Sequence, residues 1–123
     1  MSLKIATDPS NTPTITLSGR LDSMTAPGLD KALDQLLANP SLERVVFDLG
    51  ELEYLSSAGI RCFIRARKAI EPRGGKVAVV NAQPAVRKVL DIVKAIPPGG
   101  LFSSVAELDA YLDEMQRQVR EQE

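Results

Sequence analysis

The chain of 123 residues contains no histidine, no tryptophan and a single cysteine, Cys62. Without an imidazole, the sequence lacks the side chain that most often serves as a general base or a metal ligand near neutral pH. One cysteine cannot form an internal disulfide, which favours a reducing compartment. We therefore expect no metal site, no cofactor and a cytoplasmic location.

The sequence also lacks a surplus of positive charge and any long apolar run. It has 15 Lys and Arg against 16 Asp and Glu, a formal net charge of -1. A nucleic-acid binder uses a basic surplus to neutralise phosphates, and a spanning helix needs about 20 mostly apolar residues. The first ten residues show no pattern of a secretory signal. We expect neither a nucleic-acid partner nor membrane insertion.

What is present is a regular succession of strand and helix patterns. Alternating or β-branched runs predict strands at 3–6, 12–18, 44–49 and 76–81, with a short last strand at 101–102. Apolar residues at helical spacing predict four helices, which begin near Thr25, Ser57, Pro84 and Ser104. Thr25 is expected to cap the first helix, and the segment 50–55 is expected to be a connection.

The order of these elements predicts an α/β fold. Right-handed crossovers would place the strands in a mostly parallel central sheet, with an antiparallel strand at the N-terminal edge. The length fits a single domain over 1–123. Its core is expected at about 3–113, and the polar C-terminal tail 116–123 is expected to fray.

Two adjacent hydroxyls, Ser56 and Ser57, lie where the third predicted strand region leads into the second predicted helix. The first N–H groups of a helix lack intrahelical partners, so a serine there is a common cap. The same N–H groups and the helix dipole would also stabilise a phosphate added to the serine. Both interpretations, a helix cap and a phosphorylation site, are open on this ground alone.

Longer motifs favour one of them by resemblance. The stretch Phe47-Asp48-Leu49, followed by Tyr54-Leu55-Ser56-Ser57-Ala58-Gly59-Ile60 and preceded by Gly19-Arg20-Leu21-Asp22, resembles the STAS domain of anti-sigma-factor antagonists. The resemblance covers about 12–112. The two motifs together are fairly specific, whereas either one alone is weak.

The resemblance implies a partner-switching regulator and not an enzyme. In that family the unphosphorylated domain binds a serine kinase of the histidine-kinase-like ATPase type, which is also the anti-sigma factor, and the target is released. Phosphorylation ends the binding, and a serine phosphatase of the PP2C type resets it. The motif places the phosphorylated residue at Ser57, and Ser56 is a rival acceptor. The partner-binding residues implied are Asp22, Ser56, Ser57, Ala58, Gly59 and Arg61.

Two departures from the family pattern concern the residues that flank Ser57. Many members have Asp before the serine and Ser or Thr after it, whereas this chain has Ser56 and Ala58. Removing the acid reduces repulsion with a phosphate, and it also changes what a kinase would recognise. Self-association is not predicted in either direction.

Two other functions compete with this hypothesis. One keeps the fold and makes the chain a constitutive STAS subunit of an ABC-type lipid-transport complex. The other is an enzyme that uses carboxylates near the strand ends, although no spacing rule selects a pair among them. The candidates are Asp22, Asp48, Glu51 and Glu53.

The second predicted helix carries three further features. Arg61, Arg65 and Lys68 form a basic stripe, which suits either a solvated face or a docking face for an acidic partner. Cys62 is expected to be a small core residue and not a redox group. Gly59 indicates close approach of the backbone to a partner or to a neighbouring strand.

Overall fold

The structure is a computed structural model that describes residues 3–7, 12–95 and 105–122. Within these ranges, four strands form one sheet in the order β1-β2-β3-β4. They are β1 (Leu3–Thr7), β2 (Thr14–Leu21), β3 (Arg44–Leu55) and β4 (Lys76–Val80). β1 is antiparallel to β2, and the other two pairs are parallel. The predicted α/β class with an antiparallel N-terminal edge is confirmed.

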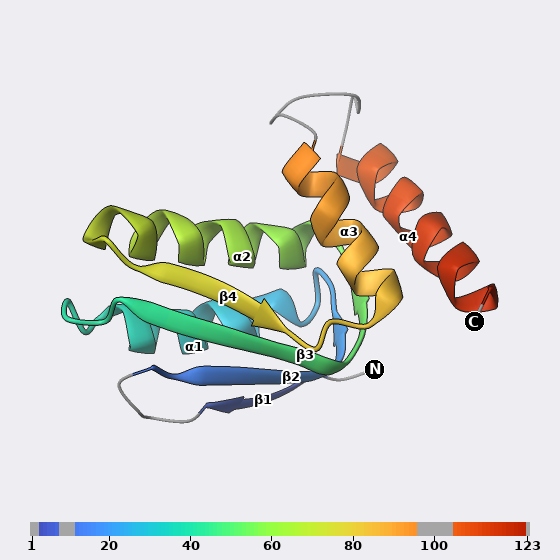
Figure 1. The fold of residues 1–123 in the computed structure, drawn as a ribbon. Coiled ribbons are helices and arrows are strands. Elements are labelled where there is room, and N and C mark those ends of the chain that lie inside the picture. The colour runs from blue at the N-terminus through green and yellow to red at the C-terminus, as the bar shows by residue number, and fades with distance from the viewer. Residues whose placement is uncertain (1–2, 8–11, 96–104, 123) are drawn as a thin grey trace.

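The same ranges contain four α-helices and one short 3-10 helix. They are α1 (Ala26–Leu37), α2 (Ser57–Ile70), η1 (Glu71–Arg73), α3 (Pro84–Ala95) and α4 (Val105–Glu121). Figure 1 shows α2 along the sheet, and α3 and α4 side by side near the end where β3 leads into α2. The predicted strand at 101–102 and the predicted cap Ser104 lie outside the described residues.

The core lies between one face of the sheet and the helices. Alternate residues of the strands, such as Ile15, Leu17 and Phe47, are fully buried, whereas the residues between them are only half-buried. The rings of Phe47 on β3 and Phe63 on α2 meet edge to face, with centroids 4.7 Å apart. This contact places α2 directly over the sheet, as an alternating strand pattern requires.

β3 and α4 extend furthest beyond their predicted ends, and β2 continues three residues past Ser18 to Leu21. β3 continues to Leu55, because Leu52 and Tyr54 are buried in alternation with exposed Glu51 and Glu53, and a register shift against β2 accommodates the extra length. α4 continues to Glu121, and the expected fraying from Gln116 is wrong: that side chain is 1% exposed.

Candidate functional site

The turn from β3 into α2 is held against the end of β2. The Ser56 N–H donates to the carbonyl oxygen of Leu21 at 2.9 Å, and the Ser56 carbonyl accepts the Ile60 N–H at 3.0 Å. Ser56 has an extended backbone, with φ -102° and ψ 177°, and is the N-cap residue. The prediction that the helix begins at Ser57 is confirmed.

The two serine hydroxyls of this turn are buried and have no partner. Ser56 is 5% exposed and Ser57 is 6% exposed, and neither Oγ hydrogen-bonds to any residue that the structure describes. A buried hydroxyl without a partner costs about 1–3 kcal/mol. Neither hydroxyl forms the cap hydrogen bond of α2, so the interpretation of the serine side chains as caps is wrong.

A carboxylate from another helix takes the place of the missing cap. The Ser57 N–H donates to Asp109 Oδ1 on α4 at 3.0 Å. A carboxylate at this position satisfies one of the first N–H groups of α2 and interacts favourably with the helix dipole. The site therefore already holds one anionic group from a distant part of the chain.

A second residue of α4, Gln116, is hydrogen-bonded to the last residue of β3. Its Oε1 accepts the Leu55 N–H at 2.9 Å, and its Nε2 donates to the Leu55 carbonyl at 2.8 Å. Sequence reasoning missed both Asp109 and Gln116. One signal for Gln116 was present, because it lies four residues after buried Leu112 and so continues the apolar side of the helix.

The loop that contains Asp22 forms a compact network at the start of α1. Asp22 Oδ1 accepts the N–H groups of Met24 at 3.0 Å and Thr25 at 3.1 Å. Thr25 Oγ1 donates to the Arg20 carbonyl at 2.8 Å and makes no cap hydrogen bond. The prediction that Thr25 caps the helix through its side chain is wrong, because Asp22 supplies the carboxylate that does so.

Gly59 allows α2 to lie close to the ends of β2 and β3. A Cβ at this position would be 2.6 Å from Leu55 Cδ1 and 2.7 Å from Leu21 Cγ, well inside contact distance. The close approach that the glycine indicates is therefore to neighbouring strands, and it brings the Asp22 loop beside Ser56. Among the other predicted partner-binding residues, Ala58 is half-buried and Arg61 is exposed.

The basic stripe on α2 divides into paired and unpaired residues. Arg65 forms ion pairs with Asp30, at 3.1 Å, and with Asp34 of α1. In the described parts of the chain, Arg61 and Lys68 form no ion pair. Arg61 therefore leaves an unpaired positive charge one turn from Ser57, while Arg65 joins the two helices.

Cys62 lies between the first turns of α1 and α2. Its Sγ is 3.4 Å from Asp30 Oδ1, 3.6 Å from the Ala58 carbonyl and 3.8 Å from the Ala26 carbonyl. Burial, with a further contribution from Asp30, raises the pKa of the thiol to about 12. The prediction of a core cysteine is confirmed, since a thiol with this pKa stays protonated and unreactive.

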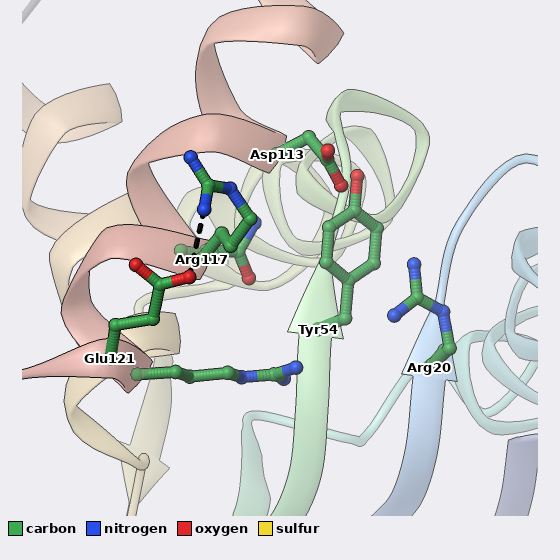
Figure 2. A pocket seen from close by; sticks show the side chains of 7 residues that line it. Arg20, Tyr54, Asp113, Arg117 and Glu121 are labelled. Carbon is green, nitrogen blue, oxygen red and sulfur yellow. Dashed lines mark hydrogen bonds and ion pairs between the residues drawn. The ribbon is translucent and has the colours of Figure 1, made fainter. Parts of the chain in front are cut away.

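A cavity of about 290 Å³ lies between α4 and the ends of β2 and β3. Figure 2 shows Tyr54 between Arg20 and Asp113, with the Arg20 guanidinium 3.9 Å from the centre of the tyrosine ring. Burial is the main cause that raises the pKa of Tyr54, and Asp113 adds to it. The rest of the lining is Gln116, Arg117, Arg120 and Glu121. Charges of both signs line this cavity.

Two of the four carboxylates considered for an enzyme, Asp22 and Asp48, lie far apart. Asp48 lies beside Thr16 in the register of the sheet, and Asp22 follows the end of the same strand β2, so about 20 Å of strand separates them. Asp48 Oδ1 accepts the Gly50 N–H at 3.1 Å and an amide hydrogen of Asn81 at 3.3 Å. Both carboxylates hold local turns.

Two other kinds of site are absent from the part of the chain that the structure describes. The described residues contain no group of three or more Cys, Asp or Glu side chains placed to hold a metal ion. None of their helices combines the length and the apolar character that crossing a bilayer requires.

Comparison with known proteins identifies the fold family. The STAS domain model matches residues 4–108. The chain belongs to the STAS domain family. This STAS chain is 30% identical over 78 residues to an anti-sigma F factor antagonist of Paenibacillus polymyxa, covering 63% of this chain and 67% of that relative.

Solved structures agree with this family. An anti-sigma factor antagonist from Mycobacterium paratuberculosis is 26% identical, with a TM-score of 0.67 over 97% of this chain and 95% of that one. The phosphorylated form of the Bacillus cell fate determinant SpoIIAA is 17% identical, with a TM-score of 0.60 over 75% of this chain and 83% of that one. The latter likeness concerns the fold. The STAS match ends at residue 108, so Asp109 and Gln116 lie beyond it.

Proposed function

We propose that this STAS domain is an anti-sigma-factor antagonist that changes partners when Ser57 is phosphorylated. The unphosphorylated form binds a serine kinase of the histidine-kinase-like ATPase type, which is the anti-sigma factor, and thereby releases its target. A PP2C-type phosphatase restores the binding form. The observation that carries the proposal is the unpartnered Ser57 hydroxyl at the N-terminus of α2. The antagonists among the relatives support it.

The chemistry of the switch follows from that position. The Ser57 Oγ attacks the γ-phosphorus of ATP, the bond from that phosphorus to the ADP oxygen breaks, and the hydroxyl proton passes to a base of the kinase. The product adds about -1.5 to -2 charges beside N–H groups that stabilise anions. A domain with a net charge of -1 thus gains a large local charge in one step.

The partner surface lies around this turn. Met24, in the loop that Asp22 holds, is 86% exposed and offers an apolar contact, and exposed Arg61 offers a positive charge. Introducing an unpaired charge into a packed interface costs about 2–5 kcal/mol, and each ~1.4 kcal/mol is tenfold in affinity. Phosphorylation is therefore sufficient to end the binding of a kinase to this surface.

The test is to map phosphate by mass spectrometry after incubation with the cognate kinase and ATP. We expect one phosphate, which is lost in Ser57→Ala and kept in Ser56→Ala. Phosphate that follows Ser56 instead would move the switch by one residue. Absence of phosphate from both serines would overturn the proposal and favour the transport-complex subunit.

The charge mechanism has its own test in kinase binding. We expect Ser57→Glu to weaken binding of the unmodified kinase by about 30-fold or more, the factor for at least ~2 kcal/mol. Ser57→Ala is the matched control, which should bind as the wild type does. Equal affinity of the two variants would contradict a switch based on charge.

A further inference from the structure

α4 is hydrogen-bonded to the residue that the proposed switch must expose. A kinase has to bring ATP to the Ser57 Oγ, yet Ser57 is 6% exposed and its Oγ is buried. The N–H of the same residue is bonded to Asp109 of α4 at 3.0 Å. Phosphorylation of Ser57 requires movement of the elements packed around it, and α4 is the element bonded to its N–H.

The attachment of α4 is concentrated in a few groups. Within its residues 109–122, the buried ones are Leu112, Met115 and Gln116, and Asp109 is half-buried. Gln116 binds both backbone groups of Leu55, directly before the serine pair. Beside Gln116, the cavity in Figure 2 separates part of α4 from Tyr54 and Arg20. In this described part, the attachment of α4 to the end of β3 and the start of α2 depends on these few groups, and weakly attached elements open without global unfolding.

We propose that α4 is a lid over Ser56 and Ser57, closed by Asp109 and Gln116, and that it must lift before Ser57 can be phosphorylated. The consequence for phosphorylation rests on the proposed function, whereas the lid itself does not. A phosphate on Ser57 would compete with Asp109 for the same N–H groups and would repel its carboxylate. The modified protein would therefore keep the lid open. Both lid residues lie beyond the STAS match, so the device belongs to this chain's C-terminal helix.

The test uses a thiol in place of the buried hydroxyl. Ser57→Cys is treated with iodoacetamide, and labelling is mapped by peptide mass spectrometry. Native Cys62, which is 2% exposed between α1 and α2, is labelled only when that contact opens and so reports larger unfolding in the same sample. Labelling at position 57 without labelling at Cys62 measures lifting of the lid alone.

The comparison is between two carboxylates on one helix. In the Ser57→Cys background, Asp109→Ala should accelerate labelling at position 57 by about tenfold, the factor for one lost charged hydrogen bond. Glu114→Ala removes the same charge from exposed Glu114, whose hydrogen bonds stay within α4, and should leave the rate unchanged. Equal rates in all three proteins, with Cys62 unlabelled, would overturn the lid.

A kinase assay separates the lid from the proposed function. With the cognate kinase and ATP, the Asp109→Ala protein should be phosphorylated on Ser57 faster than the wild type. If labelling depends on Asp109 and no phosphate is added, the lid stands and the proposed function is wrong. If phosphate is added at one rate in the wild type, Asp109→Ala and Glu114→Ala, the switch stands and the lid is wrong.

Discussion

The N-termini of α1 and α2 are neighbours that are closed in different ways. At α1, the N–H groups of Met24 and Thr25 are bonded to the carboxylate of Asp22, two and three residues before them. At α2, the Ser57 N–H is bonded to Asp109, 52 residues away, while both serine hydroxyls have no partner among the described residues. One helix has a local cap, and the other takes its cap from a separate helix.

This difference separates a permanent feature from a removable one. A cap within the same loop cannot leave without unwinding that loop, whereas a cap from another helix leaves when that helix moves. The α2 terminus is therefore suited to exchange one anion, the Asp109 carboxylate, for another, a phosphate. The α1 terminus holds the adjacent partner surface in place during that exchange.

The largest effect that should distinguish the two termini comes from the third residue of each helix, a glycine in both. At Gly59 an added Cβ would be 2.6 Å from Leu55, and at Gly28 it would be 3.8 Å from Ile5, an ordinary contact. Gly59→Ala should lower the free energy of unfolding by about 1–3 kcal/mol. Gly28→Ala should raise it by up to about 1 kcal/mol through helix propensity. Urea titration measures both, and a loss of stability at both sites would contradict the difference in packing.

A smaller contrast is expected between the two capping carboxylates. Asp22→Ala should lower the free energy of unfolding by about 1–2 kcal/mol, because two N–H groups lose their acceptor. Asp109→Ala should cost less than about 1 kcal/mol, because the higher helix propensity of alanine in α4 offsets part of the lost hydrogen bond. The same titration compares them. A larger loss at Asp109 would make it a structural cap and not a removable one.

The smallest effect concerns Cys62, where the two helices meet. The pKa of this thiol is about 12 in the folded state, above the ordinary value of about 8.5. The buried protonated thiol therefore contributes its full stability below about pH 8.5, and this contribution is lost as the pH rises toward 12. We expect stability to fall by about 1 kcal/mol between pH 9 and 10. The fall should be smaller in Cys62→Ala, in which the raised pKa of Tyr54 still acts in the same direction. An equal fall in both proteins would show that the pKa of Cys62 is not raised in the folded state.

Local patterns in the sequence predict most of the fold. Alternating and β-branched runs predict the four strands of the sheet, and helical spacing predicts the α-helices. The serine pair lies at the start of α2, as expected. The length of β3 was underestimated because Gly50 interrupts the apolar run, although Leu52 and Tyr54 resume it. Local chemistry of this kind can be read without knowing the tertiary structure.

The cap of α2 could not be predicted in this way. Asp109 and Gln116 meet partners 52 and 61 residues away, and no periodicity states which turn of one helix faces the end of another. The motifs that resemble the family indicate Ser57, but they end at Ile60 and include neither Asp109 nor Gln116. The lid thus emerges only from tertiary contacts.

Hydrogen exchange measured by NMR at two amides tests most directly the difference between the N-termini of α1 and α2. The Ser57 N–H is bonded to Asp109, and the Ala26 N–H is bonded to the Asp22 carbonyl at 2.8 Å. In Asp109→Ala, we predict that the Ser57 amide loses its protection while the Ala26 amide keeps it. Unchanged protection of Ser57, or equal loss at both amides, would contradict a removable cap at the switch serine.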